Sequence, residues 1–161
     1  MYADASKLES MLNLNCYHVM SLMHSFTQRL KIRSQHSGIV VISSLAGMLP
    51  TPGNLTYSAS KAFCRSLCKA VNWEIKSAEL NIDVLCTMPS FVETKMIAHL
   101  KKPANSIPVG QFVDTALRDL GQTEESNGAF RHELTGVIGI FGDKYLQSVL
   151  MYLYKLLVAK G

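Results

Sequence analysis

An apolar run that leads directly into two serines constrains the fold of this chain more than any other feature. Residues Ile39–Ile42 are four consecutive apolar residues, typical of a short buried strand, and Ser43 and Ser44 follow at once. After a loop, a helical stretch carries Tyr57 and Lys61 one turn apart and therefore on one face. The pattern predicts a strand–loop–helix unit that brings a hydroxyl, a phenol and an ammonium together at one strand end.

These three groups suit the reduction of a ketone. A ketone that accepts a hydride becomes an alkoxide, which needs a proton donor beside it, and a phenol can serve when a cation stabilises the phenolate. Tyr57 and Lys61 provide this pair, and Ser44 can hydrogen-bond the substrate oxygen and fix its orientation. A Tyr-x-x-x-Lys pair alone is a weak motif, but the two serines and the proline-containing loop before it favour the catalytic interpretation.

Three segments of the chain resemble the short-chain dehydrogenase/reductase family. They are Gly38–Gly47 (GIVVISSLAG), Tyr57–Phe63 (YSASKAF) and Pro89–Met96 (PSFVETKM), in the order and spacing of the family. Within it, the chain is most similar to the branch of 17β-hydroxysteroid dehydrogenases and very-long-chain 3-oxoacyl-CoA reductases, through Lys101–Pro103, Asp119–Gly121 and Ser126–Gly128. The resemblance covers nearly the whole chain.

The resemblance implies a catalytic tetrad. Tyr57 would be the general acid and base, Lys61 its partner and a ligand of the nicotinamide ribose, and Ser44 the donor to the substrate oxygen. Asn15 would complete the tetrad by holding a water that connects the lysine to solvent. Asn13 lies two residues away, so the assignment could shift, and a surface amide without a role is the alternative for Asn15.

The cofactor implied by the resemblance is NADP, with NAD as the alternative. The cofactor-binding residues would be Tyr57, Lys61, Pro89, Val92 and Thr94. In the family the threonine of the last segment contacts the nicotinamide carboxamide, and Thr94 occupies its position. Ser90 replaces the usual glycine of that segment, which weakens the cofactor assignment. Thr94 could also be the N-cap of a short helix, a role compatible with the contact.

The order of elements predicts an α/β fold with a doubly wound parallel sheet. Helices are expected over Leu8–Arg33, Tyr57–Ala78 and 110–120, and a second strand over 81–88, ended by Pro89. Strand, long helix and strand in succession give parallel strands, whose carboxyl ends carry the ligand site. No Gly-x-Gly-x-x-Gly turn is present, so the chain is expected to be the C-terminal part of a Rossmann fold that lacks the N-terminal cofactor-binding strands.

Two parts of the chain differ in composition. Residues 1–133 would form the catalytic half of the domain, and residues 134–161 an apolar tail that packs on the domain or lies on a membrane. No stretch reaches the roughly 20 apolar residues of a membrane span. Val137–Phe141 could be a strand or a helix, and the resemblance favours a helix.

Charge and cysteine content exclude several classes of site. The net charge is +4, and no basic run is longer than Lys101-Lys102, which gives no support for nucleic-acid binding. Four cysteines occur without C-x-x-C spacing and without a cluster of histidines beside them: Cys16, Cys64, Cys68 and Cys86. They predict buried thiols in a reducing compartment rather than a zinc site or a disulfide framework, so we expect no metal site.

Two functions remain. The first is reduction of a hydrophobic ketone, a 3-oxoacyl-CoA or a 17-ketosteroid, by a chain that is incomplete and poorly active alone. The second is a truncated, non-catalytic chain that acts by dimerisation with a related reductase. In the family a homodimer forms through the helices that correspond to Leu8–Arg33 and Tyr57–Ala78. The resemblance implies the cytosolic side of the endoplasmic reticulum membrane, or the cytoplasm if the short form exists by itself.

Overall fold

The computed structural model describes residues 4–49, 51, 53–98, 103, 105–141 and 152. Its helices are α1 (Ala5–Leu12), α2 (His18–Leu30), α3 (Leu55–Ser77), α4 (Val109–Asp119) and α5 (Phe130–Phe141). A π-helical turn, η1 (Asn13–Tyr17), joins the first two, and η2 (Leu45–Gly47) and η3 (Lys95–Ile97) are 3-10 turns. The strands are β1 (Ser37–Ile42), β2 (Ile82–Thr87) and β3 (Glu125–Ser126).

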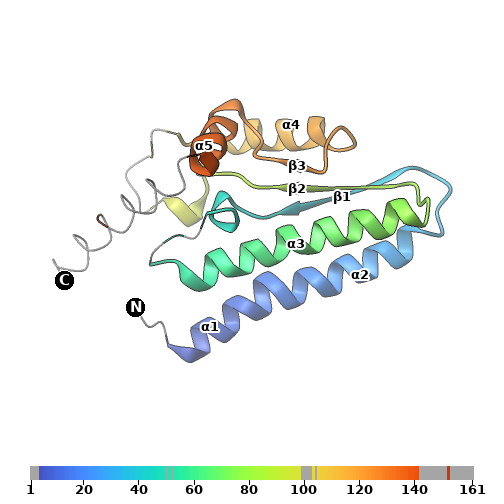
Figure 1. Cartoon of the computed structure of the whole chain (residues 1–161), viewed down its shortest axis with the longest axis horizontal. Coiled ribbons are helices and arrows are strands. Elements are labelled where there is room, and N and C mark those ends of the chain that lie inside the picture. Colours follow the sequence, from blue (N-terminus) through green and yellow to red (C-terminus); the bar gives the residue numbers. More distant parts are fainter. Residues whose placement is uncertain are drawn as a thin grey trace.

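The strands form one parallel sheet in the order β1-β2-β3. Ser37 lies opposite Ile82, and the pairing continues to Ile42 opposite Thr87. Helices α2 and α3 lie against one face of the sheet and α4 lies over the other, so the fold has three layers (Figure 1). The parallel α/β arrangement expected from the sequence is therefore confirmed for the described residues.

One edge of the sheet is open in the part of the chain that the structure describes. β1 pairs with β2 along one side, and no described strand pairs with its other side. The residue that follows α4, Leu120, packs over this strand, because a Cβ atom at Gly38 would lie 2.6 Å from its Cδ2 atom. Leu120 thus packs over the start of β1, whereas Ile42 at its end is exposed and no described strand pairs with its outer backbone edge.

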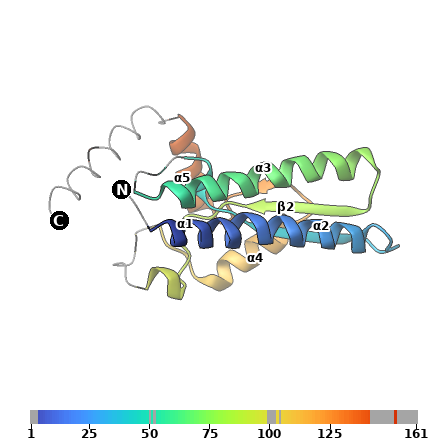
Figure 2. The same cartoon turned by 90° about the horizontal axis from the view of Figure 1, so that it is seen from below.

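The helix expected over Leu8–Arg33 is present as the continuous succession α1–η1–α2, which runs alongside α3 (Figure 2). The apolar residues of this helix, which recur in the sequence as a periodic stripe, are divided between the core and the surface. Met23 is buried, and Val19 and Leu30 pack at the margin of the core. Several other stripe residues are exposed: Leu12, Leu14, Leu22 and Phe26. This helix lies beside α3 and contacts the rest of the described domain with one side, so the residues on its other side are exposed (Figure 2).

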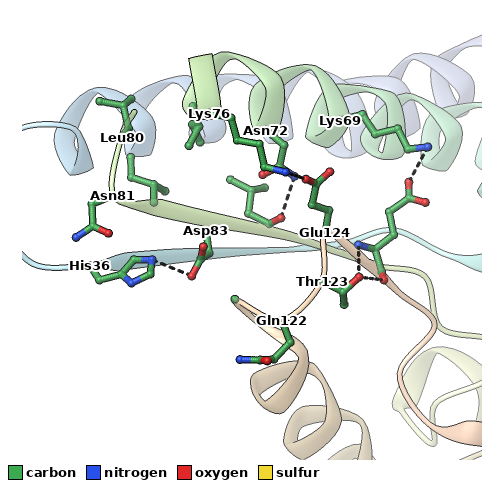
Figure 3. A pocket seen from close by; sticks show the side chains of 15 residues that line it. His36, Lys69, Asn72, Lys76, Leu80, Asn81, Asp83, Gln122, Thr123 and Glu124 are labelled. Carbon is green, nitrogen blue, oxygen red and sulfur yellow. Dashed lines mark hydrogen bonds and ion pairs between the residues drawn. The ribbon is translucent and has the colours of Figure 1, made fainter. Parts of the chain in front are cut away.

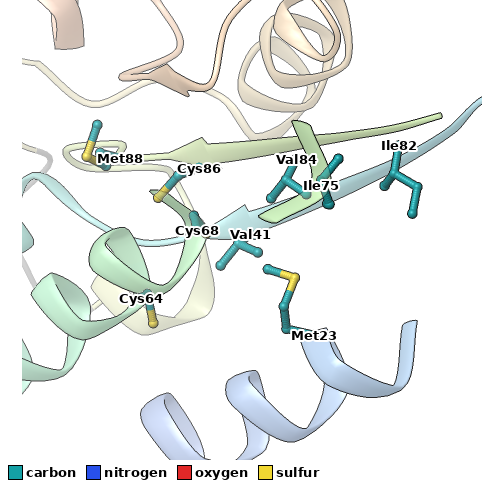
Figure 4. Close-up of a cluster of buried hydrophobic side chains, with 9 residues drawn as sticks. All are labelled: Met23, Val41, Cys64, Cys68, Ile75, Ile82, Val84, Cys86 and Met88. Atoms are coloured by element: carbon teal, nitrogen blue, oxygen red, sulfur yellow. The ribbon is translucent and has the colours of Figure 1, made fainter. Parts of the chain in front are cut away.

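The main core lies between the two long helices and the sheet. It consists of Met23, Val41, Cys64, Cys68, Ile75, Ile82, Val84, Cys86 and Met88 (Figure 4). The prediction of buried free thiols is confirmed for Cys64, Cys68 and Cys86, while Cys16 is half-buried. Burial raises the pKa of the Cys64 thiol, which keeps it neutral and suited to apolar packing.

The third strand was not predicted from the sequence, and neither were the ion pairs that hold it. Glu125 accepts two hydrogen bonds from Arg65, of 2.8 and 2.9 Å, and also pairs with Lys69 at 3.3 Å. Glu124 pairs with Lys76. In the sequence these two glutamates are most simply interpreted as solvated charges, whereas the structure places both in ion pairs. Their partners all lie on α3, and a cavity of about 780 Å³ lies between that helix and the start of β3 (Figure 3).

We expect Glu125→Gln to lower the free energy of unfolding by about 1 kcal/mol at pH 7, because it removes a bidentate, partly buried ion pair. Burial raises the pKa of this carboxyl, but Arg65 and Lys69 outweigh it and the pKa lies below its ordinary value. The stabilisation is therefore present above the unfolded-state pKa and is lost as the pH falls through the folded-state pKa.

Urea unfolding of the wild type and the variant between pH 7 and pH 3 measures this effect. Glu124→Gln is the matched control, because its pair with Lys76 is more exposed and should contribute less. The wild-type and Glu125→Gln curves should converge at acid pH. Equal losses for the two variants, or a gap that persists at pH 3, would contradict the assignment.

Candidate active site

Ser44 lies at the carboxyl end of β1, where the chain turns into η2. Its backbone is extended, and its Oγ atom accepts a 3.2 Å hydrogen bond from the Ala46 N–H, so the side chain caps the turn. The turn is anchored to the end of β2, because the Leu45 N–H donates to the carbonyl of Pro89 at 3.0 Å. Ser44 is therefore held at the strand edge where open parallel sheets bind ligands.

Tyr57 and Lys61 lie in the first turns of α3, and both are half-buried. The Lys61 Nζ atom lies 5.7 Å from the centre of the Tyr57 ring and donates a 3.0 Å hydrogen bond to the carbonyl of Ile42. Ile42 is two residues before Ser44, so the ammonium reaches the same strand end as the serine. The structure brings the predicted phenol, ammonium and hydroxyl to one region of the molecule.

Asn15 lies in η1 and contacts α3. Its Nδ2 atom donates to the Ser60 hydroxyl at 3.0 Å, and that hydroxyl donates to the carbonyl of Tyr57 at 2.8 Å. The backbone carbonyl of Asn15 accepts a 3.1 Å bond from the Cys64 thiol. A π-helical turn frees backbone groups from the α-helical pattern, and such turns occur often at functional sites. The alternative candidate, Asn13, is exposed.

The third predicted segment follows β2. Pro89 is buried, Val92 pairs with Ile107 in an isolated parallel bridge, and the Thr94 N–H donates to the Val92 carbonyl at 2.7 Å. Thr94 precedes η3 at the N-cap position, but its side chain makes no capping hydrogen bond and is exposed. Its hydroxyl is thus available to a ligand, which is compatible with the cofactor role expected of it.

Two of the polar groups fit the nicotinamide and ribose portion of a dinucleotide. An ammonium has three protons to donate, and Lys61 uses one of them on Ile42, which leaves donors for ribose hydroxyls. The exposed hydroxyl of Thr94 can bond a carboxamide. Lys61 and Thr94 thus suit the nicotinamide and ribose half of the cofactor. A Gly-rich turn of the type that binds the pyrophosphate does not occur in the sequence.

Sequence reasoning missed the residues that fasten these elements together. Ser60 is fully buried and joins Asn15 to the backbone of Tyr57. Ser43 is also buried, and its hydroxyl donates to the carbonyl of Lys61 at 2.7 Å. The sequence did contain a signal for Ser60. A serine three positions after Tyr57 in a helix can donate a hydrogen bond to the Tyr57 backbone carbonyl.

A buried histidine outside the predicted tetrad links the last helix to the loop after β2. His132 is fully buried, and its Nε2 atom donates to the carbonyl of Asn105 at 3.0 Å. The side chain of Asn105 donates in turn to the Ser90 hydroxyl at 2.9 Å. Ser90, which replaces the usual glycine, is thus connected through Asn105 to His132 of α5.

In the described part of the chain, no helix is long and apolar enough to cross a membrane. The same part contains no group of three or more His, Cys, Asp or Glu residues that could hold a metal ion. The interval Val137–Phe141, which the sequence left open, is the end of α5, and this helix runs across the boundary expected at residue 133. Most of the tail, 142–151 and 153–161, and Lys101-Lys102 lie outside the described residues.

Comparison with known proteins identifies the class to which this fold and this site belong. A family model described as short chain dehydrogenase matches residues 2–105. The chain therefore belongs to the short-chain dehydrogenase family, whose members are NAD(P)-dependent oxidoreductases. This result supports the resemblance drawn from Ser44, Tyr57 and Lys61.

Named relatives refine that result without fixing the substrate. The chain is 33% identical over 147 residues to the very-long-chain 3-oxoacyl-CoA reductase of Anas platyrhynchos, covering 89% of this chain and 46% of that protein. It is 32% identical over 132 residues to the Homo sapiens protein of the same name, covering 81% of this chain and 41% of that one. The chain thus spans less than half the length of these relatives.

Solved structures show the same fold. A short-chain dehydrogenase from Burkholderia cenocepacia in complex with NADP superposes with a TM-score of 0.76 at 22% identity, over 91% of this chain and 60% of that one. A structure from a study of 7β-hydroxysteroid dehydrogenase stereoselectivity gives a TM-score of 0.77 at 21% identity, over 91% and 58%. At these identities the likeness establishes the fold, and the chemistry has to be argued from the site.

Proposed function

We propose that this chain is the catalytic half of an NADP(H)-dependent reductase that acts on a hydrophobic ketone. The observation that carries the proposal is the position of the Lys61 ammonium, 5.7 Å from the centre of the Tyr57 ring and bonded to the last carbonyl of the strand that leads to Ser44. A proton donor, its cationic partner and a hydrogen-bond donor for a carbonyl are the groups that ketone reduction requires.

In this proposal each residue acts on the substrate oxygen or on its proton. The Ser44 hydroxyl donates to the carbonyl oxygen and orients it. Bound NADPH would supply the hydride to the carbonyl carbon. Tyr57 donates its phenolic proton to the oxygen as negative charge develops there, and Lys61 stabilises the resulting phenolate. Asn15, in the π-helical turn, would hold the water through which a proton returns from solvent.

The proposed substrate class rests on the names of the relatives and on the hydrophobic ketones that the family resemblance implies. The Anas platyrhynchos and Homo sapiens relatives are both named very-long-chain 3-oxoacyl-CoA reductases, which favours a 3-oxoacyl-CoA over a 17-ketosteroid. Pro89, Val92 and Thr94 would contribute to the nicotinamide site beside Tyr57 and Lys61. The adenosine portion of NADP would be bound by residues outside this sequence, so we expect the chain alone to turn over slowly.

A chimera tests the proposal. The N-terminal part of the Anas platyrhynchos relative is placed before this chain, and oxidation of NADPH is followed with a long-chain 3-oxoacyl-CoA and with a 17-ketosteroid. We expect turnover in the chimera with the acyl-CoA, and little from the 161-residue chain alone. A properly folded chimera that reduces neither ketone would contradict the proposed function, and rapid turnover by the chain alone would contradict its dependence on the missing half.

A second function, association with a related reductase, is favoured by the exposed face of α1–η1–α2. Four large apolar side chains of this helix are exposed in the described chain: Leu12, Leu14, Leu22 and Phe26. Leu22 and Phe26 are four residues apart and therefore lie on one face. Together with α3 this helix would form a homodimer interface. Membrane attachment through the tail, and a place on the cytosolic side of the endoplasmic reticulum, remain parts of the proposal carried by the family resemblance.

We expect the chain to be a dimer with a mass of about twice 17.8 kDa. Phe26→Asp should make it monomeric, because the carboxylate at position 26 would have to be desolvated in the interface. Phe26 is 46% exposed in the single chain. Light scattering after size exclusion measures the mass. Leu117→Asp is the control, since Leu117 is 62% exposed on α4, across the sheet. A dimer that survives Phe26→Asp but not the control change would place the interface elsewhere.

A further inference from the structure

The turn that carries Ser44 rests directly on the helix that carries Tyr57 and Lys61, and a glycine permits this contact. A Cβ atom at Gly47 would lie 2.6 Å from the carbonyl carbon of Lys61, and 2.8 Å from both its carbonyl oxygen and the Ala62 nitrogen. Cβ atoms in proteins essentially never approach other atoms this closely. All three neighbours are backbone atoms of α3, so they cannot rotate away as the end of a flexible side chain would.

The glycine is needed at this position for space and not for its backbone conformation. The glycines with positive φ in the described chain are Gly53, Gly121 and Gly128, and Gly47 is not among them. Any other residue could adopt the backbone of Gly47, but its first side-chain atom would force η2 and α3 apart. The feature that depends on this residue is therefore the separation of the two elements.

Ser43, which lies before the turn, contacts the same backbone carbonyl of Lys61 in α3. Its hydroxyl donates to the Lys61 carbonyl at 2.7 Å, and its own N–H donates to the Thr87 carbonyl of β2 at 2.7 Å. Ser43 is 3% exposed, so this bond is shielded from water. The Lys61 carbonyl thus receives a hydrogen bond from the residue before Ser44 and a close contact from the residue three positions after it.

On the basis of the proposed function, we infer that Gly47 and Ser43 are positioning residues that set the distance between the Ser44 hydroxyl and the Tyr57–Lys61 pair. Ser44 lies between the two contacts, so its separation from α3 is determined where Ser43 and Gly47 meet the Lys61 backbone. A shift of about 1 Å in the groups that orient a substrate can cost roughly 100-fold in rate. The contact therefore has a consequence for catalysis beyond its contribution to packing.

The structural arm of the test compares crystal structures of the chain with Gly47→Ala and with Gly110→Ala. The second is a matched control, because a Cβ atom at Gly110 would meet nothing within 4 Å. Ordinary contact begins at 3.4 Å, so the added methyl at position 47 has to move the turn from Lys61 by about 0.8 Å. A turn that keeps its distance from α3 in the Gly47→Ala structure would overturn the inference, and this arm requires no activity.

The kinetic arm uses the chimera. We expect Gly47→Ala to lower kcat about 100-fold with little change in KM, and Ser43→Ala, which adds no bulk and tests the same contact if Gly47→Ala does not fold, to lower kcat about 10-fold. In a Ser44→Ala background both changes should have little further effect on kcat, because they act through the Ser44 hydroxyl. A merely structural role would give the same fold loss in both backgrounds, which would contradict the inference.

The two proposals fail in different ways. If Ser44→Ala leaves kcat unchanged, or the chimera reduces no ketone, the proposed function is wrong, and the displacement of the turn in the crystal structure still decides the role of Gly47. If Ser44→Ala lowers kcat but Gly47→Ala and Ser43→Ala behave like Gly110→Ala, the proposed function stands and the inference is wrong.

Discussion

In the active chimera, Tyr57→Phe should lower kcat by about 1,000-fold and leave KM for the ketone nearly unchanged. The change removes one oxygen atom and keeps the ring beside Lys61, so substrate binding is preserved while the proton donor is lost. A positioned general acid contributes about 100- to 10,000-fold, and a loss confined to kcat is typical of an interaction made in the transition state. A 1,000-fold loss corresponds to about 4 kcal/mol of transition-state stabilisation.

Tyr17→Phe is the matched control, because Tyr17 is a largely exposed tyrosine at the end of η1. It should leave kcat unchanged. The measurement is steady-state oxidation of NADPH at saturating cofactor, with circular dichroism to show that both variants are folded. Turnover that survives Tyr57→Phe would remove Tyr57 from its proposed role, and equal losses in the two variants would point to a general effect on the fold.

The largest expected effect on stability comes from Leu85→Ala in the middle of β2. Leu85 is 0% exposed, and alternation along the strand points it away from the core that contains Val84 and Cys86, toward the layer of α4. Truncation of a fully buried leucine removes apolar contacts and leaves a cavity, so we expect a loss of about 3 to 5 kcal/mol in the free energy of unfolding. This is a large part of the stability of a typical domain.

Leu117→Ala provides the same chemical change at a site that is 62% exposed on α4. It should alter the free energy of unfolding by less than about 0.5 kcal/mol, because little apolar area is uncovered and alanine favours the helix. Urea titrations followed by circular dichroism measure both variants. Similar losses would mean that Leu85 is not enclosed between the sheet and α4 as described.

The elements with strong local signals could be predicted from the sequence. The apolar run before Ser43, the long periodic segment of α3 and the strand ended by Pro89 all formed close to the expected bounds, and the parallel pairing followed from their order. The two-residue strand β3 could not be predicted in this way. It is too short to show alternation and depends on ion pairs with Arg65 and Lys69, which lie about 60 residues earlier in the chain.

The candidate site likewise contains features that could be predicted from the sequence and features that could not. The spacing of Tyr57 and Lys61 predicts a shared helix face, and the structure confirms that they lie together. The π-helical turn at Asn15 could not be predicted, because nothing in its sequence distinguishes it from an α-helical turn. The roles of Ser43, Ser60 and Gly47 arise from contacts between segments far apart in the chain, which periodicity does not reveal. The catalytic roles themselves stay predictions.

The open edge of β1 affects how this polypeptide behaves in solution. Along that side, within the part of the chain that the structure describes, alternate residues of the six-residue strand present backbone N–H and C=O groups without a strand partner, and the segment SGIVVI contains no lysine or proline to discourage pairing. Such an edge is a template for a strand of another molecule. At the concentrations used for purification we expect such an edge, where no segment covers it, to favour intermolecular sheets and fibrillar aggregates, so colloidal stability depends on which segment covers this edge.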